Sequence, residues 1–338
     1  MSETSVRWGM LSTAGIGRLV ATAMRQSEQA DLVAVASRDA ARARVYADDV
    51  GIDASFGSYE ELLAADEVDA VYVALPVSMH AEWTLRALEA GKHVLCEKPF
   101  TLDPLDAARC FHAAEAAGRV CIEGLMYRLH PQTTLAARLV AEGAIGRLAT
   151  VRAALTVSVP PGDIRRSVPL GGGALGDLGC YCVSAIRLFA GEPERAHAEQ
   201  VRDGEDGVDL RMAATLAMPD GVLGLLDVGL DLPRRDELEL IGTQGKVTVP
   251  DPWLCRAGHV ELERDGRSER LPVDPTGTVL TDPDHDAYRI EFEAASAAIA
   301  GTEKPRFGRA DAIAQAEALE ALQRSAAQGR PVELGVAS

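Results

Sequence analysis

The first part of the chain alternates short apolar runs with segments of helical periodicity. The apolar runs are residues 6–11, 32–36, 70–75, 93–96 and 120–122. The helical segments are residues 16–26, 39–49, 80–90 and 103–117. Alternation of this kind is typical of a parallel sheet with connecting helices. The pattern predicts an α/β fold whose N-terminal domain, residues 1–125, is a doubly wound Rossmann sheet that binds a dinucleotide.

Beyond residue 125 the pattern changes to β-rich segments. They are residues 148–157, 212–218, 222–230, 237–241 and 246–249, and helical spacing occurs at 131–142, 173–190, 286–300 and 309–323. Turn residues at 219–221 and 242–245 favour antiparallel neighbours. We expect residues 126–338 to form an α+β domain with a predominantly antiparallel, open-faced sheet that binds substrate, its final helices being free to pack on the Rossmann domain.

The open face of this second sheet predicts self-association. Val222, Gly224, Leu226 and Val228 alternate along one predicted strand. A sheet covered by helices on one side only would leave them exposed, and soluble monomers rarely expose a large apolar patch. We therefore expect a homodimer or homotetramer formed through the C-terminal sheet.

Composition and charge narrow the choice of partner. The 338 residues are 47% hydrophobic and 25% charged, as in ordinary globular proteins. A net charge of −17 disfavours nucleic acid or a membrane surface as the main partner. We find no signal peptide and no apolar run of about 18 residues. Six cysteines at irregular spacing predict reduced core thiols, and no residues have metal-ligand spacing. We expect a cytoplasmic protein that binds a small molecule and no metal.

A turn of small residues follows the first predicted strand. Ser12, Ala14 and Gly17 occupy the three small positions of a dinucleotide-binding turn, although the match is degenerate. Small residues let the backbone approach a pyrophosphate, and the following helix offers its N-terminal N–H groups. The predicted cofactor-binding residues in this turn are Ser12, Thr13, Ala14, Gly15 and Ile16.

The end of the second predicted strand indicates which dinucleotide binds. NAD enzymes usually place an acidic residue about 20 residues after the glycine turn, to bind the ribose 2′-hydroxyl. Ser37 and Arg38 stand there instead. A hydroxyl and a guanidinium suit a 2′-phosphate, so we predict NADP as the cofactor. The alternative is that Arg38 is merely solvated at a helix start that Asp39 caps.

The most specific segment is residues 90–100, which places Glu97-Lys98-Pro99 directly after a buried run. Related motifs are the Val-Tyr-Val-Ala-Leu-Pro run at 71–76, His80, Glu-Gly-Leu-Met-Tyr-Arg-Leu-His-Pro-Gln at 123–132 and Gly-Gly-Gly-Ala-Leu-Gly-Asp-Leu-Gly-Cys-Tyr at 171–181. Together they resemble the Gfo/Idh/MocA family, named after glucose-fructose oxidoreductase, inositol dehydrogenase and rhizopine catabolism. The resemblance covers nearly the whole chain.

The resemblance implies the catalytic residues. In the family, the lysine of Glu-Lys-Pro lies beside the nicotinamide and the proline is commonly cis; here these are Lys98 and Pro99. Tyr181 stands where many members carry His. Tyrosine there resembles the branch that contains NADP-dependent D-xylose dehydrogenase, dimeric dihydrodiol dehydrogenase and the deoxysugar 3-ketoreductases. Asp177 lies four residues earlier, on the same helix face. We expect Lys98, Tyr181 and Asp177 to be catalytic.

Further binding residues come from both predicted domains. The other cofactor-binding residues that we expect are Leu75, Pro76, His80, Glu97, Lys98 and Arg165. The expected substrate-binding residues are Lys98, Tyr127, Arg128, Arg165, Asp177, Tyr181 and Tyr288. His130, beside Pro131, is as well placed to cap a helix as to touch a ligand.

These features predict an NADP-dependent oxidoreductase. Its reaction would transfer a hydride between nicotinamide and a secondary alcohol or ketone of a sugar, cyclic polyol or related diol. The alternatives within the enzyme class are a nucleotide-linked 3-keto-deoxysugar reductase and a trans-dihydrodiol dehydrogenase. Some relatives are NADP-binding regulatory proteins and others are glycosidases that hold NAD. Intact Lys98, Asp177 and Tyr181 argue against the first class, and Ser37-Arg38 argues against the second.

Overall fold

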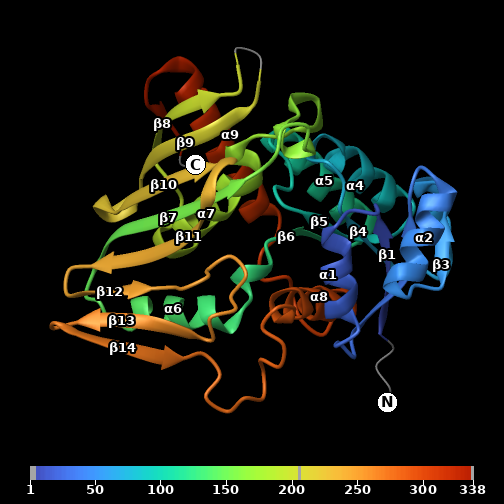
Figure 1. Cartoon of the computed structure of the whole chain (residues 1–338), viewed down its shortest axis with the longest axis horizontal. Coiled ribbons are helices and arrows are strands. Elements are labelled where there is room, and N and C mark those ends of the chain that lie inside the picture. The colour runs from blue at the N-terminus through green and yellow to red at the C-terminus, as the bar shows by residue number, and fades with distance from the viewer. Residues whose placement is uncertain (1–4, 205–206, 336–338) are drawn as a thin grey trace. The chain divides into compact units, whose positions relative to one another are not determined.

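The computed structural model describes residues 5–204 and 207–335, which divide into two units (Figure 1). Unit 1 contains the described residues up to Thr101, Leu105–Met126 and His285–Ile313. Unit 2 contains Leu102–Pro104, Tyr127–Asp284 and the described residues from Ala314 onward. After the short stretch Leu102–Pro104, the chain enters unit 2 again at Tyr127, and the sequence predicted a boundary at 125.

Unit 1 is built on a six-stranded parallel sheet with the order β3-β2-β1-β4-β5-β6. Its strands are β1 (Val6–Leu11), β2 (Ala30–Ala36), β3 (Ala54–Phe56), β4 (Ala70–Val73), β5 (His93–Glu97) and β6 (Cys121–Gly124). The inner strands are almost continuously apolar because a parallel sheet is covered on both faces. This is the doubly wound Rossmann order, so the predicted fold of the first domain is confirmed.

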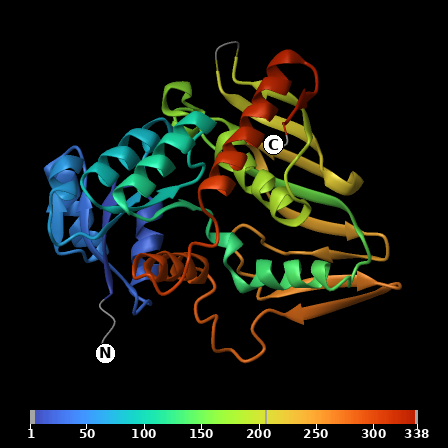
Figure 2. The same cartoon turned by 180° about the vertical axis from the view of Figure 1, so that it is seen from behind.

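The helices of unit 1 include the four of the predicted alternation and a short one over residues 59–63 that was not predicted. They are α1 (Ile16–Met24), α2 (Ala40–Val50), α3 (Tyr59–Leu63), the short η1 (Val77–Met79), α4 (His80–Glu89), α5 (Pro104–Ala117) and α8 (Asp286–Ile299). Figures 1 and 2 show α4 and α5 side by side on this sheet. Helix α8 is one of the final helices that we expected to be free to pack on the Rossmann domain, and it belongs to unit 1, where Phe292 packs edge-on against Trp8 of β1 and Tyr72 of β4.

Unit 2 is built on a nine-stranded sheet with the order β14-β13-β12-β11-β7-β10-β9-β8-β15. Its strands are β7 (Leu148–Ser158), β8 (Arg195–Arg202), β9 (Asp209–Ala217), β10 (Leu223–Gly229), β11 (Asp231–Gly242), β12 (Gly245–Thr248), β13 (His259–Arg264), β14 (Arg267–Pro272) and β15 (Val332–Glu333). Strands β7 and β10 run parallel, and the other described pairs are antiparallel. The predicted, predominantly antiparallel sheet is confirmed.

The helical segments of unit 2 lie beside this sheet (Figure 2). They are η2 (Met126–Arg128) at the boundary, α6 (Pro131–Ala141), η3 (Ile164–Arg166), η4 (Val168–Leu170), η5 (Leu175–Gly179), α7 (Cys180–Ala190), η6 (Pro219–Gly221) and α9 (Arg309–Gln328), which begins in unit 1. Helix α7 packs against β7 and β10. The single α-helix predicted over 173–190 is wrong in its first turns, because η5 is a π-helical turn that holds an extra residue.

The stretch Val168–Ala190 is long and apolar enough by composition to cross a membrane, which we did not expect from the sequence. Its most apolar 18-residue window has a mean hydropathy of 1.2, and 78% of that window is buried inside the structure. Burial among protein side chains is what the core helix of a globular unit shows. We therefore interpret this stretch as the core of unit 2.

The residues predicted on the open sheet face point the other way. The buried residues on the helix-covered face are Val222, Gly224, Leu226 and Val228. A Cβ atom at Gly224 would lie 2.5 Å from Ile186 of α7. The alternation predicted a strand correctly, but alternation does not say which side the helices cover. The outward positions of the same strand include Leu223, which is 50% exposed, and Leu225.

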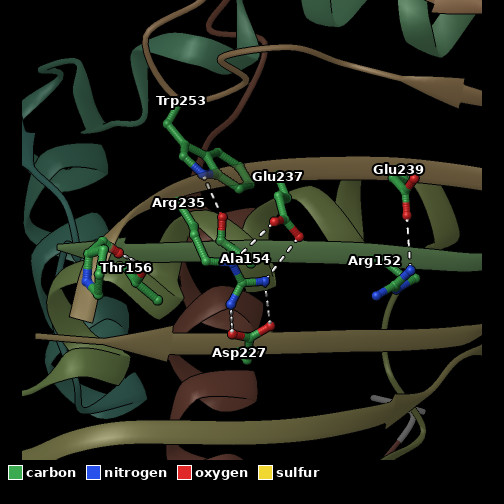
Figure 3. A network of polar contacts seen from close by, with 9 residues as sticks. Arg152, Ala154, Thr156, Asp227, Arg235, Glu237, Glu239 and Trp253 are labelled. Carbon is green, nitrogen blue, oxygen red and sulfur yellow. Dashed lines mark hydrogen bonds and ion pairs between the residues drawn. The ribbon is translucent and has the colours of Figure 1, made fainter. Parts of the chain in front are cut away.

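The uncovered face carries charges as well as apolar side chains (Figure 3). Arg235 forms ion pairs with Asp227 and Glu237 at 2.7 and 3.0 Å, and Arg152 pairs with Glu239 at 3.1 Å. Exposed pairs such as these add little to stability. A shallow groove of about 310 Å³ crosses this face, and its lining includes Arg152, His197, Thr215, Leu225, Asp227 and Glu237.

Candidate functional site

The carboxyl ends of the strands in unit 1 carry most of the predicted cofactor residues. Strands β1, β2, β4 and β5 end at Leu11, Ala36, Val73 and Glu97. Because the strands are parallel, the segments that follow them, residues 12–16, 37–38, 74–76 and 98–99, share one edge of the sheet (Figure 1). Doubly wound proteins bind their ligands at this edge.

The turn after β1 has an unusual backbone. Ser12 has φ of 136°, in the region that favours glycine, and its N–H donates to the Ala36 carbonyl at 3.2 Å. Its Oγ accepts from the Ala14 N–H at 2.9 Å. The Tyr46 hydroxyl donates to the Ala14 carbonyl at 3.0 Å. These contacts hold a serine where dinucleotide-binding turns usually have glycine.

Two glycines shape the start of α1. A Cβ atom at Gly17 would lie 2.3 Å from the Met10 sulfur and 2.5 Å from the Tyr46 hydroxyl, so a larger residue would require both side chains to move. Gly15 is exposed, and the space around its Cβ position is open to 4 Å. The N-terminus of α1 therefore faces an open site beside the turn. A helix N-terminus in such a position suits a phosphate group.

Two guanidinium groups gather beside this turn. Arg38 hydrogen-bonds the side chain of Tyr59. The positive charge of Arg42 lies close enough to the same side chain to favour its ionised form. Arg42 Nε also donates to Thr13 Oγ1 at 3.2 Å. Asp39 caps α2 by accepting a hydrogen bond from the Arg42 N–H at 3.1 Å. The sequence-based prediction that Asp39 caps this helix is therefore confirmed. Ser37 is only 3% exposed.

His80 lies beneath the edge rather than on it. The side chain is 1% exposed, with Nε2 at 2.8 Å from the Leu75 carbonyl and Nδ1 at 3.0 Å from the Pro99 carbonyl. Burial lowers its pKa, whereas these carbonyls oppose that shift. A neutral imidazole donates from one nitrogen only. The geometry favours a role for His80 in tying the segment after β4 to the segment after β5.

Carboxyl groups surround the backbone of Lys98. Glu97 accepts a hydrogen bond from the Lys98 N–H at 3.2 Å and another from the Tyr72 hydroxyl. Glu291 of α8 is 3% exposed, and burial, followed by the charges of Glu97 and Glu123, raises its pKa well above the usual range. The Lys98–Pro99 peptide bond is cis, as the family resemblance implied.

In unit 2, Tyr181 belongs to an aromatic cluster. Its ring centroid lies 5.8 Å from that of Trp253 and 6.0 Å from that of Tyr127, and the side chain is 8% exposed. Tyr127 is fully buried and donates its hydroxyl to Ser184 Oγ at 2.7 Å, and burial raises its pKa. Tyr127 therefore supports the Tyr181 ring in this structure, and its hydroxyl is already used.

Asp177 and Arg165 lie within electrostatic reach of each other. Arg165 donates from Nε and Nη2 to the Asp163 carboxylate at 2.9 and 3.0 Å, and this pair raises the pKa of Arg165. The charge of Asp177 contributes to the same shift. Asp163 thus holds the Arg165 guanidinium within electrostatic reach of Asp177.

The other predicted residues are buried. Arg128 and His130 are 3% and 1% exposed. His130 Nδ1 accepts from the Gln132 N–H at 3.1 Å, so the capping alternative for His130 is confirmed. Tyr288 is 5% exposed and lies on α8 in unit 1, close enough to Tyr72 for its ionised form to raise the pKa of Tyr72.

The structure thus forms two sets of candidate residues. In unit 1, residues 12–16, 37–38, 75–76 and 97–98 share one sheet edge, and in unit 2 Arg165 lies within electrostatic reach of Asp177, four residues before Tyr181. The pairing of Lys98 with Tyr181 stays a prediction. Sequence reasoning missed Arg42, whose signal was its spacing one helical turn after Arg38. It also missed Trp253, for which the sequence offered no signal.

Comparison with known proteins identifies the family. The N-terminal profile described as "Oxidoreductase family, NAD-binding Rossmann fold" matches residues 6–125, and the "GFO/IDH/MocA C-terminal domain" profile matches residues 133–248. D-xylose 1-dehydrogenase (NADP(+)) 2 of Haloferax volcanii is 38% identical over 335 residues, which cover 97% of this chain and 99% of that protein.

Other relatives match along the same length. The trans-1,2-dihydrobenzene-1,2-diol dehydrogenase of Danio rerio is 31% identical and covers 95% of this chain and 96% of its own. The structure of a 3-ketoreductase from Actinomadura kijaniata in complex with NADP and TDP-benzene is 33% identical, with a TM-score of 0.85, and covers 95% and 98% of the two chains. The chain belongs to the Gfo/Idh/MocA oxidoreductase family of NAD(P)-dependent dehydrogenases and reductases.

Proposed function

We propose that this family member uses NADP to oxidise a secondary alcohol, or to reduce the matching ketone, on a sugar, cyclic polyol or related diol. The observation that carries the proposal is the pair Arg38 and Arg42 beside the turn at residues 12–16. Asp39, the carboxylate nearest to them in sequence, is used as the cap of α2. A pair of guanidinium groups suits a 2′-phosphate better than a 2′-hydroxyl.

The residues of unit 1 fit a bound dinucleotide. The open N-terminus of α1 and the backbone of residues 12–16 would hold the pyrophosphate. Arg38 and Arg42 would hold the 2′-phosphate, and the segments at Leu75-Pro76 and Glu97-Lys98 would flank the nicotinamide. When bound, the nicotinamide supplies or accepts the hydride. The protein must orient the substrate and move one proton.

We assign the proton to Tyr181, which would exchange it with the substrate oxygen. Lys98 would polarise that oxygen, because an ammonium group also favours loss of a nearby phenolic proton. Asp177 would position a neighbouring hydroxyl group of the substrate. Arg165, held by Asp163 and close to Asp177, would help to fix that hydroxyl. Buried hydrogen-bonding groups distinguish hydroxylated rings more sharply than apolar walls do.

The two alternative substrates are a nucleotide-linked 3-keto-deoxysugar and a trans-dihydrodiol. Relatives are named for D-xylose, for trans-dihydrobenzenediol and for a dTDP-linked 3-keto-dideoxysugar. The relative with the highest of these identities, at 38%, is the D-xylose dehydrogenase, which favours a free sugar. A nucleotide-linked sugar would need a further binding region for its nucleotide, and none of the candidate residues described above is assigned to such a region.

A substrate screen tests the proposal. Sugars, polyols and dihydrodiols are offered with NADP⁺, and keto-sugars with NADPH, and the absorbance of the reduced cofactor is followed. We expect turnover with a free sugar or polyol and NADP⁺, and weaker turnover with NAD⁺. Turnover confined to a TDP-linked keto-sugar would favour the reductase alternative. Preference for NAD⁺ would contradict the NADP assignment.

We further propose that the protein works in the cytoplasm as a homodimer or homotetramer. The cysteines of the described residues are all free thiols, as is usual in a reducing compartment. The uncovered face of the unit 2 sheet, with Leu223, Leu225 and the groove beside them, offers the contact surface.

A further inference from the structure

An acidic side chain from β9 lies at the start of the segment that carries Asp177 and Tyr181. Asp209 Oδ2 accepts a hydrogen bond from the Leu175 N–H at 2.7 Å, and Leu175 is the first residue of η5. The backbone of Ala174 also stabilises the ionised carboxylate. The first turn of a helix has N–H groups without intrahelical acceptors, so this carboxylate satisfies groups that the π turn cannot.

The glycines before η5 make room for this contact. Gly173 has φ of 132°, and a Cβ atom there would lie 2.1 Å from Asp209 Oδ1. A Cβ atom at Gly172 would lie 2.4 Å from the Arg165 carbonyl, to which the Gly173 N–H donates at 2.9 Å. Only glycine at both positions allows the chain to pass between Arg165 and Asp209. The position of the carboxylate and the positive φ thus explain Gly173, and the Arg165 carbonyl explains Gly172.

The surroundings of Asp209 raise the pKa of its carboxyl group toward neutral pH. Burial raises its pKa to about 6, while the Leu175 and Ala174 backbone and the charge of Arg202 oppose that rise. Arg202 lies directly opposite Asp209 in the ladder between β8 and β9. Around neutral pH the side chain is therefore mostly an ionised acceptor for the first N–H groups of the segment.

We propose that Asp209 is a positioning residue: by anchoring Leu175 it fixes the start of η5 and so the placement of Asp177 and Tyr181. Asp177 lies two residues beyond the anchored amide and donates its own N–H to the Gly173 carbonyl at 3.0 Å. A shift at Leu175 would thus move the Asp177 carboxylate first and the Tyr181 hydroxyl through the following turn. The kinetic part of this inference rests on the proposed function.

Three variants test the anchor. Asp209→Ala removes the acceptor, and Asp209→Asn keeps one acceptor oxygen without the charge. The control is Asp265→Asn, an exposed acidic residue in the β13–β14 turn, where φ of 54° is one that asparagine tolerates. For each variant, amide hydrogen exchange is mapped in the cofactor-free protein at pH 7.5, NADP affinity is measured by calorimetry, and kcat and KM are measured on the substrate found in the screen.

We expect Asp209→Ala to speed exchange at residues 174–181 by about 3- to 30-fold, the usual effect of losing a helix cap. We also expect kcat to fall about 10- to 100-fold, because small displacements of reacting groups are costly, with NADP affinity unchanged. Asp209→Asn should recover most of both effects, and Asp265→Asn should have neither.

Unchanged exchange at residues 174–181 in Asp209→Ala would overturn the anchor. Faster exchange spread over all of unit 2, with kcat unchanged, would also overturn it and leave Asp209 a merely structural residue. Failure of the proposed function looks different: the wild-type protein would then turn over no substrate in the screen, while the exchange pattern would still confirm or contradict the anchoring of Leu175.

Discussion

Single residues in this protein are explained by what their backbone neighbours allow. Ser12 adopts a backbone conformation that favours glycine, and it uses its own hydroxyl to bind the Ala14 N–H. Gly17 cannot be replaced by a larger residue without meeting the Met10 sulfur. The degenerate glycine pattern of this turn therefore follows from one position that tolerates a serine and another where glycine avoids two side chains.

We expect cofactor choice to depend on the guanidinium groups of Arg38 and Arg42. Arg38→Ala should weaken NADP binding by about 1.5 to 3 kcal/mol, the scale of a charge-assisted contact, and leave NAD binding nearly unchanged. Arg42→Ala should act in the same direction. Arg44→Ala is the matched control, since Arg44 lies on the same helix and pairs with Asp48. Titration calorimetry with both cofactors checks this. An equal loss for NADP and NAD would show that these arginines only support the fold.

Most elements could be predicted from the sequence because their apolar spacing is clear. Strand β8 was missed since its residues Arg-Ala-His-Ala-Glu-Gln-Val-Arg bury only Ala196 and Ala198, and pairing with β9 rather than local preference makes it a strand. The hairpin of β13 and β14 is similarly polar. The prediction of which β10 side chains point outward was wrong. Alternation defines two faces of the strand, and only the position of α7 shows which of them is covered.

The candidate site could be predicted in part. Local signals of a small turn and of strand ends pointed to residues 12–16, Arg38 and Lys98, and the family resemblance pointed to Asp177 and Tyr181. For other residues the structure adds what the sequence could not: the Tyr127 hydroxyl donates to Ser184 Oγ, and both ring nitrogens of His80 face backbone carbonyls, while their binding roles stay predictions. Asp209 had no signal, because its contact with Leu175 joins residues 34 apart in sequence.

The stability of the segment formed by η5 and α7 should also depend on pH, through the ionisation of Asp209. Its pKa is raised from 3.8 to about 6, so the folded state binds a proton more tightly than the unfolded state. Its stabilising contribution is complete below about pH 4 and is lost as the pH rises through 6. Asp209→Asn removes this dependence. The free energy of unfolding of Asp209→Asn, relative to wild type, should therefore rise by about 1 to 3 kcal/mol between pH 4 and pH 7.5.

Denaturant titrations at several pH values measure this difference. Asp265→Asn, which changes an exposed carboxylate, is the control. A difference between Asp209→Asn and wild type that stays constant with pH, or that falls toward pH 7.5, would contradict the raised pKa.

The whole molecule should associate through the uncovered face of the unit 2 sheet. Light scattering at micromolar concentration should give a mass that is a multiple of the 35.8 kDa chain. Leu225→Arg, in the groove on that face, should reduce the mass, because it places a bulky charged side chain in the contact. Leu105→Arg is the control, since Leu105 is 72% exposed on α5 in unit 1. A wild-type mass equal to one chain would contradict the proposed oligomer.

The central claim is that Tyr181 and Lys98 act together on the substrate oxygen in an NADP-dependent reaction. The most direct test is the turnover of Tyr181→Phe and Lys98→Met at saturating NADP⁺ across pH 6 to 10. Tyr181→Phe keeps the ring but removes the proton donor, so kcat should fall about 10²- to 10⁴-fold with NADP affinity little altered, and Lys98→Met should cost at least as much. If Tyr181→Phe kept most of its turnover while Lys98→Met lost it, the roles would be reversed. Turnover retained by both variants would contradict the account.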